Sequence, residues 1–90
     1  MATNYPVSII ILNYNGLHWL GPCLTTVKAQ THQPIEVIVV DNDSTDGSCD
    51  FVRDNFREVR LLCLPENRGY AGANNHAARE AQGDFSFLPQ

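Results

Sequence analysis

The stretch Ile35–Gly47, which reads I-E-V-I-V-V-D-N-D-S-T-D-G, decides the fold. It opens with a mostly apolar, β-branched run of strand length and passes directly into a cluster of Asp, Asn and Ser. Such a run is typical of a strand that is buried on both faces of a parallel sheet. We expect Ser44 or Thr45 to cap a helix that continues to about Phe56. The stretch therefore predicts a strand, a polar loop and a helix in succession.

The same succession of strand, polar loop and helix recurs on both sides of this stretch. The predicted strands are Val7–Asn13, Ile35–Val40, Val59–Leu64 and Phe85–Leu88, and the predicted helices are Leu17–Gln30, a segment ending near Phe56, and Tyr70–Gln82. Pro22 fits best in a first helical turn, so the first helix is expected to begin nearer Leu20. His32–Pro34 breaks the chain, and Gly83 stops the third helix. The order βαβαβαβ predicts one α/β domain over residues 1–90, an open parallel sheet with helices on both faces.

Size and charge exclude several classes of protein. The chain has 90 residues and a formal net charge of −4, without a run of Lys or Arg. Nucleic-acid backbones are held by clustered basic residues, so no nucleic-acid partner is expected. The longest apolar runs, Ile9–Leu12 and Val37–Val40, are far too short to cross a bilayer, and the N-terminus carries no secretory signal. We expect a cytoplasmic protein with no membrane segment in this portion.

The cysteines Cys23, Cys49 and Cys63 are odd in number and form no C-x-x-C pair. This spacing indicates neither a disulfide framework nor a metal site. We therefore expect buried or bystander thiols in a reducing compartment.

Three polar clusters follow the predicted strands, namely Asn13–Asn15, Asp41–Asp43 and Asn67–Gly69. Ligands of open parallel sheets bind outside the carboxyl ends of the strands, where these clusters meet. Asn offers a donor and an acceptor while Asp only accepts, a mixture that suits a nucleoside. Gly69 and Gly72 let a ligand approach the next helix N-terminus, and Arg68 can contact a phosphate. The alternative is that these glycines serve only a turn and tight packing.

A phosphatase is a second interpretation of the middle cluster. Asp41–Thr45 resembles the D-x-D-x-T signature of haloacid-dehalogenase-type phosphatases, in which the first Asp is the nucleophile. That family also needs a later lysine, whereas Lys28 precedes the motif and is the single lysine of the chain. The phosphatase is therefore the weaker alternative.

Three motifs together resemble the family 2 glycosyltransferases of the GT-A fold, most closely their rhamnosyltransferase-like branch. They are P-V-S-I-I-I-L-N-Y-N-G (Pro6–Gly16), V-I-V-V-D-N-D-S-T-D-G-S (Val37–Ser48) and E-N-R-G-Y-A-G-A-N-N (Glu66–Asn75). The likeness runs from about Pro6 to Gly83. It implies the N-terminal, donor-binding half of an enzyme that transfers a sugar from a UDP- or dTDP-sugar to an acceptor hydroxyl. The resemblance also implies a role in polysaccharide or cell-envelope glycan synthesis.

The resemblance implies roles for individual residues at the strand ends. Asp41 would accept an N–H from the base, and Asn13 and Asn15 would line the base and ribose pocket. Tyr14 would pack on the base or serve only in packing. The predicted nucleotide-binding set is Asn13, Tyr14, Asn15, Asp41, Asn42, Asn67, Arg68 and Gly69, of which the last three would border ribose and diphosphate. Outside the set, the residues expected to hold the loop and cap the helix are Asp43, Ser44 and Asp46. His18 and Trp19 are expected to be packing or surface residues, and His76 and Arg79 to lie on the solvated side of the third helix.

Catalytic and metal-binding residues are expected beyond this chain. The family places an acidic D-x-D-like metal motif just past the fourth strand and its base further on, whereas Phe87–Gln90 contains no acidic residue. We therefore predict no catalytic or metal residue here, Mg²⁺ or Mn²⁺ in the full-length enzyme, and no activity of the truncated chain alone. The alternative is a non-catalytic nucleotide-binding or interaction module. Phe85 and Phe87 should share one face of the last strand, whose edge offers a route to self-association.

Overall fold

The computed structural model describes residues 7–30, 35–82 and 84–88. The elements are β1 (Val7–Asn13), α1 (Leu17–Gln30), β2 (Glu36–Asp41), α2 (Ser48–Asn55), β3 (Arg60–Cys63), α3 (Gly69–Glu80) and β4 (Asp84–Phe87). All strand pairs are parallel and the sheet order is β3-β2-β1-β4. The predicted open parallel α/β sheet is confirmed. The predicted break at His32–Pro34 and the stop at Gly83 lie outside the described residues.

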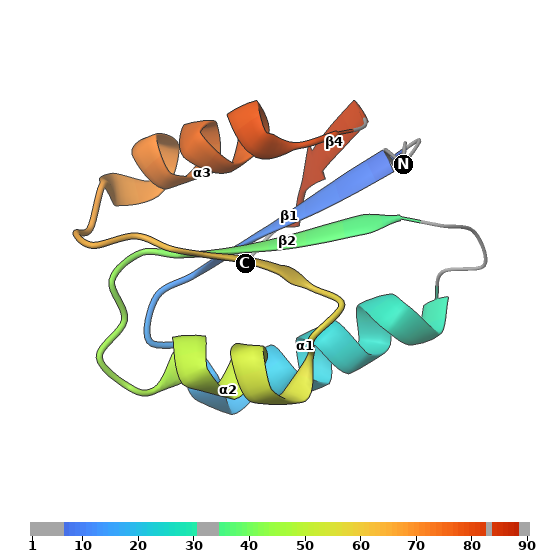
Figure 1. The fold of residues 1–90 in the computed structure, drawn as a ribbon, viewed down its shortest axis with the longest axis horizontal. Helices are drawn as coiled ribbons and strands as arrows, with labels where there is room; N and C mark the ends of the chain where they lie inside the picture. Colours follow the sequence, from blue (N-terminus) through green and yellow to red (C-terminus); the bar gives the residue numbers. More distant parts are fainter. Residues whose placement is uncertain (1–6, 31–34, 83, 89–90) are drawn as a thin grey trace.

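The sheet lies between two helical layers (Figure 1), with α3 on one face and α1 and α2 on the other. The chain steps outward from β1 to β2 to β3, then returns across the sheet through α3 to place β4 on the other side of β1. This reversal of direction at β1 is the topological switch point at which open α/β sheets bind ligands.

The strand residues alternate between two apolar cores. One core faces α3 and comprises Ile10, Leu12, Ile38, Val40, Leu64, Ala73 and Ala77. The other faces α1 and α2 and comprises Ile11, Leu20, Leu24, Val37, Val39, Val52 and Val59. Every residue of β2 is buried, which explains its unbroken run of β-branched side chains. Two alanines on the buried side of α3 let that helix pack closely on the sheet.

Helix α1 begins at Leu17, and the prediction of a start nearer Leu20 is wrong. Gly16 O accepts the amides of Trp19 and Leu20 at 3.0 Å each, which starts the helix before the proline is reached. Pro22 therefore lies inside the helix and removes one hydrogen bond. Both Pro22 and the turn before it at His18 are exposed, so water can satisfy the released carbonyl group.

Helix α2 begins at Ser48, later than predicted, and neither Ser44 nor Thr45 caps it. The residue before the helix is Gly47, whose φ of 87° lies in the left-handed region that favours glycine. The Ser44 side chain is occupied elsewhere, because its hydroxyl donates to Asp41. Asp46 performs the capping instead, accepting the amide of Ser48 at 3.0 Å.

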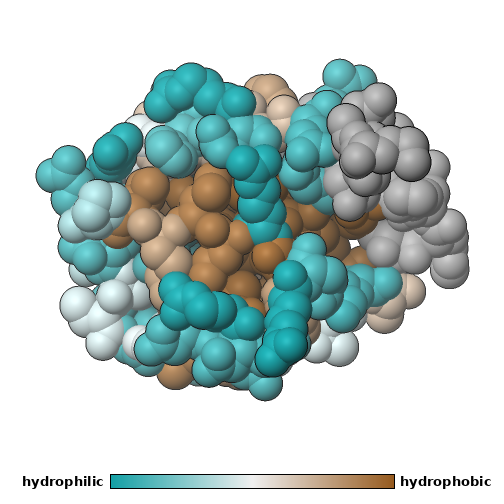
Figure 2. Space-filling model, in the orientation of Figure 1, coloured by the Kyte–Doolittle hydropathy of each residue, from teal (hydrophilic) through white to brown (hydrophobic). Residues whose placement is uncertain are grey.

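Strand β4 lies at one edge of the sheet and pairs with β1 alone. Phe85 and Phe87 are 48% and 40% exposed, and their ring centroids lie 5.5 Å apart, so the prediction that they share a face is confirmed. The opposite edge is β3. Figure 2 shows an apolar band across the middle of the molecule, at the level of the sheet, between more polar surfaces above and below.

Candidate functional site

The carboxyl ends of three strands lie side by side. Asn13, the last residue of β1, pairs in register with Asp41, the last of β2, and Asp41 pairs with Cys63, the last of β3. Three loops therefore start at the same level of one sheet edge. We name them the first loop (residues 13–16), the second loop (residues 41–47) and the third loop (residues 64–68). The sequence predicted this meeting of polar clusters, and the register confirms it.

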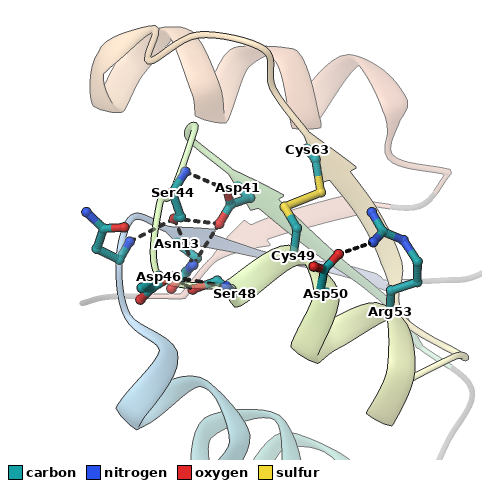
Figure 3. The surroundings of a disulfide bond; sticks show 10 residues. Asn13, Asp41, Ser44, Asp46, Ser48, Cys49, Asp50, Arg53 and Cys63 are labelled. Carbon is teal, nitrogen blue, oxygen red and sulfur yellow. Dashed lines mark hydrogen bonds and ion pairs between the residues drawn. A yellow bond between two sulfur atoms is a disulfide. The ribbon is translucent and has the colours of Figure 1, made fainter.

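Asp41 joins the first loop to the second. Its Oδ1 accepts Asn13 Nδ2 at 2.7 Å and Ser44 Oγ at 2.8 Å, and its Oδ2 accepts the Ser44 amide at 2.9 Å. Figure 3 shows these side chains converging above the strand ends. The Asp41 side chain is only 2% exposed. A carboxylate offers about four lone pairs, so these three bonds leave one acceptor position on Oδ2.

The first and second loops are also tied through Asn15. Its backbone N–H donates to Ser44 Oγ at 2.8 Å, and its side-chain Oδ1 accepts the backbone N–H of Thr45 at 2.8 Å. Asn15 and Asp43 have φ angles of 52° and 69°. This left-handed conformation is uncommon outside glycine, and Asn and Asp tolerate it best. The residue types in these loops thus match the backbone that the loops adopt.

Asp46 anchors the helices that leave both loops. Its Oδ2 accepts the amide of Leu17, the first residue of α1, at 3.0 Å, and its Oδ1 accepts the amide and hydroxyl of Ser48, the first residue of α2. The hydrogen bond from the Ser48 side chain, assisted by the amides of Leu17 and Ser48, lowers the pKa of Asp46. The expectation that Ser44 and Asp46 hold the loop is confirmed.

Asn42 joins the second loop to the third. Its Oδ1 accepts the Arg68 amide at 2.8 Å, and its Nδ2 donates to Gly69 O at 3.3 Å. Its own amide donates to Asn13 O at 2.9 Å. Asn67 Oδ1 adds a bond from the Gly69 amide at 2.8 Å. The start of α3 is therefore fixed to the end of β2.

The predicted site residues divide into a buried and an exposed group. Asn13, Asp41 and Asn42 are 0%, 2% and 4% exposed and form a framework beneath the surface. Tyr14, Asn15, Asn67, Arg68 and Gly69 are exposed at the sheet edge. Tyr70, 63% exposed in the first turn of α3, was given no role from the sequence. An aromatic residue directly after Arg68-Gly69, in a helix of otherwise mostly small residues, was the available signal.

Asn13 has one unsatisfied atom. Among the described residues, its Oδ1 is the buried side-chain atom without a hydrogen-bond partner. Because Nδ2 donates to Asp41, Oδ1 must face away from that carboxylate. A Cβ added at Gly16 would lie 2.5 Å from this oxygen and 2.0 Å from Trp19 Nε1, so only glycine fits there.

A disulfide bond flanks the second loop, which corrects the prediction of three thiols. Cys49 and Cys63 are bonded, with Cα atoms 6.4 Å apart (Figure 3). The 14-residue separation carries no disulfide signature in the sequence, but the fold places the start of α2 beside the end of β3. Cys23 remains a free thiol, and burial raises its pKa. His18 is exposed and Trp19 packs against the core of α1, as expected.

Residues 7–30, 35–82 and 84–88 contain no group of three His, Cys, Asp or Glu side chains that could hold a metal ion. Within the same residues, no helix is both long and apolar enough to cross a membrane.

The family profile of Glycosyl transferase family 2 matches residues 8–88, and the chain therefore belongs to this family. A curated relative is the UDP-Glc:alpha-D-GlcNAc-diphosphoundecaprenol beta-1,3-glucosyltransferase WfaP of Escherichia coli, 35% identical over 85 residues. That alignment covers 91% of this chain and 34% of the relative. The chain thus spans about a third of the length of this curated relative.

Two solved structures share the fold, which is that of GT-A glycosyltransferases. The mannosyltransferase PcManGT from Pyrobaculum calidifontis, in complex with GDP-Man and Mn²⁺, has a TM-score of 0.74 and 31% identity, covering 88% of this chain and 25% of that one. TarS 1-349 from S. aureus, in complex with UDP, has a TM-score of 0.78 and 28% identity, covering 91% of this chain and 26% of that one. Family membership removes the phosphatase alternative.

Proposed function

We propose that this chain is the nucleotide-binding portion of a sugar-nucleotide-dependent glycosyltransferase, with a UDP- or dTDP-sugar as donor. The transfer would be to an acceptor hydroxyl in polysaccharide or cell-envelope glycan synthesis, and a donor of the dTDP type would fit the rhamnosyltransferase-like branch. The observation that carries the proposal is that three hydrogen-bonded loops meet at the carboxyl ends of β1, β2 and β3, beside the switch point of the sheet. The UDP and GDP-Man complexes of the two related structures support it.

In this proposal the framework positions the exposed residues against the nucleotide. Tyr14, which is 55% exposed, would pack on the base. The remaining lone pair on Asp41 Oδ2 would accept the ring N–H of uracil or thymine. Asn13 would shape the base pocket from below, through its bond to Asp41. Asn15, exposed beside Tyr14, would bond to the ribose.

The third loop would bind the diphosphate. Arg68 is exposed and would neutralise phosphate charge, which matters for a chain whose net charge is −4. Gly69 would let the phosphate come close, and the amides that follow it in the first turn of α3 would bind the phosphate oxygens, because a helix N-terminus has free N–H groups. Asn67 holds the Gly69 amide and would border the ribose.

The chain covers only about a third of its relative's length, so transfer itself is part of the proposal. We place the ligands of a divalent cation, Mg²⁺ or Mn²⁺, and the catalytic base outside the described residues. A divalent cation would offset the charge of the departing diphosphate. The 90-residue chain alone is then expected to show no turnover of UDP- or dTDP-sugars. Turnover above a blank, with Mg²⁺ or Mn²⁺ present, would contradict the proposal that the metal ligands and the catalytic base lie outside the described residues.

We also propose a cytoplasmic location. The cytosol keeps most protein thiols reduced, so the Cys49–Cys63 bond would there be exposed to reduction. The redox state of this bond is therefore a condition to be fixed in every binding experiment on the chain.

Isothermal titration of the folded chain with UDP, dTDP and GDP tests the proposed donor class. We expect weak but saturable binding of UDP and dTDP, weaker binding of GDP, and loss of affinity for the diphosphates in Arg68→Ala. Arg53→Ala is the matched control, because Arg53 is exposed on α2 and paired with Asp50, away from the three loops. Absence of UDP and dTDP binding, or equal losses in the two arginine variants, would refute the proposed site.

A further inference from the structure

We propose that Asn42 is a positioning residue that sets the affinity of the site for the diphosphate group. It would act through the Arg68–Gly69 turn and would not itself touch the ligand. The inference rests on the proposed function and deepens it, because it assigns to one buried amide the geometry of the phosphate-binding loop.

The Asn42 amide holds both sides of the turn. Its Oδ1 accepts the Arg68 amide at 2.8 Å, and its Nδ2 donates to Gly69 O at 3.3 Å. The backbone of Asn42 is itself anchored, because its backbone N–H donates to Asn13 O at 2.9 Å. The Asn42 side chain thus fixes the backbone of Arg68 relative to the ends of β1 and β2.

The turn is confined from the opposite side as well. A Cβ added at Gly72 would lie 3.0 Å from Arg68 Cβ, so the first turn of α3 packs closely against Arg68. Gly69 has a φ of 73°, a conformation that suits glycine and reverses the chain at this point. Arg68 therefore lies between the Asn42 amide and the backbone of α3.

Only an amide of this length supplies both bonds. Asn carries a donor and an acceptor on one planar group, whereas Asp only accepts and Leu does neither. Asn42 is 4% exposed, so water cannot readily replace a lost bond. Asn42→Asp keeps an acceptor for the Arg68 amide but sets a charged carboxylate oxygen against Gly69 O, whereas Asn42→Leu loses both bonds and adds no charge.

The same geometry separates Asn42 from ligand contact. Both polar atoms of its side chain are engaged by the turn, and the side chain lies under the surface. Its removal should therefore weaken binding of the diphosphate through Arg68 and leave binding of the nucleoside unchanged. A merely structural role would weaken both.

The test compares UDP with uridine as ligands of the full 90-residue chain. The net contribution of one such hydrogen bond is about twofold to tenfold in an equilibrium constant. We expect the Kd for UDP to rise about tenfold or more in Asn42→Leu, and at least about threefold in Asn42→Asp, where the new charge adds to the lost bond; the Kd for uridine should stay unchanged within about twofold. In an Arg68→Ala background, Asn42→Leu should cost much less, because the two residues act as a unit.

Asn55→Asp is the matched control, since Asn55 is exposed on α2 and its amide donates to Phe51 O. It should change neither Kd. Hydrogen exchange gives a readout without nucleotide, because the Arg68 amide should exchange faster in Asn42→Leu and remain protected in Asn42→Asp. If Asn42→Leu fails to fold, the smaller and uncharged Asn42→Ala replaces it, because the charge of Asn42→Asp would itself repel the diphosphate.

Equal losses for uridine and UDP, unchanged UDP binding in both variants, or full additivity with Arg68→Ala would each overturn the inference. Failure of the proposed function has a different signature: the unaltered chain would then bind neither UDP nor uridine, and the inference would fall with it.

Discussion

Replacing Asp41 by Asn tests how the framework carries the site, because the change keeps the shape of the side chain and removes its charge. The carboxylate accepts three hydrogen bonds, two on Oδ1 and one on Oδ2. An Asn side chain at position 41 must turn its NH₂ group toward either the backbone N–H of Ser44 or the side-chain NH₂ of Asn13. Either orientation sets a donor against a donor in a place that is 2% exposed.

The expected loss follows from that geometry. A hydrogen bond to a charged group contributes about 1.5–3 kcal/mol, and at least one is lost. Asp41→Asn should therefore lower the free energy of unfolding by about 2–3 kcal/mol. This is a large share of the roughly 5–13 kcal/mol expected for a domain of this size. Nucleotide affinity should fall in addition by about 1.5–3 kcal/mol if Oδ2 accepts a base N–H.

Urea unfolding followed by circular dichroism, together with UDP titration of the folded variant, measures both effects. Asp43→Asn is the matched control, because it removes the same charge from the same loop at an exposed residue whose φ of 69° suits Asn. It should be neutral within about 0.5 kcal/mol. Equal losses in the two variants would mean that loop charge alone matters, and an unchanged stability of Asp41→Asn would refute the framework.

Three further predictions concern the disulfide, the helix anchor and the sheet edge. Reduction of Cys49–Cys63, checked by thiol titration, should lower the free energy of unfolding by about 3 kcal/mol for a loop of this size. Reduction should have the same effect in a Cys23→Ser variant, because Cys23 takes no part in the bond. The lowered pKa of Asp46 means that the unfolded chain binds its proton more readily, so its stabilising effect is complete above the ordinary pKa of about 3.9 and is lost as pH falls through the folded value. Urea unfolding at pH values from about 5 to 2 should show this loss, and a slope unchanged in Asp46→Asn would contradict it. Sedimentation should show concentration-dependent self-association through β4 that Phe87→Lys abolishes, since charges block edge pairing, and a monomer at all concentrations would exclude that edge.

The fold followed from the sequence because its signals are local and repeated. A buried strand such as β2 is recognised in the sequence by its unbroken run of β-branched residues. Parallel strands joined by helices leave few alternative fold topologies. The helix starts were harder to predict, because the Asp46 carboxylate accepts the first backbone amide of both α1 and α2. Asp46 is 29 positions from Leu17 and 2 positions from Ser48. Propensity at Ser44 and Pro22 could not reveal it.

The site was predicted as a set of residues and not as an arrangement. Residue types at the strand ends located all three loops, because the carboxyl ends of parallel strands meet at one edge. Which members are buried depends on pairings such as Asn42 with Arg68, 26 residues apart, and no local pattern encodes them. The Cys49–Cys63 bond was missed for the same reason, since it depends on where α2 starts relative to β3.

We place the bound nucleotide at the edge formed by the three loops, and an amide chemical-shift titration of the chain with UDP is the decisive test of this placement. We expect saturable shifts at millimolar nucleotide confined to residues 13–16, 41–44 and 67–72. Residues of α2 beyond its first turn and the groove beside β3, lined by Arg53, Phe56 and Leu61 among others, should stay unmoved. Shifts that gather in that groove or scatter over the helices, or no shifts at all, would contradict the assignment of this edge as the nucleotide site.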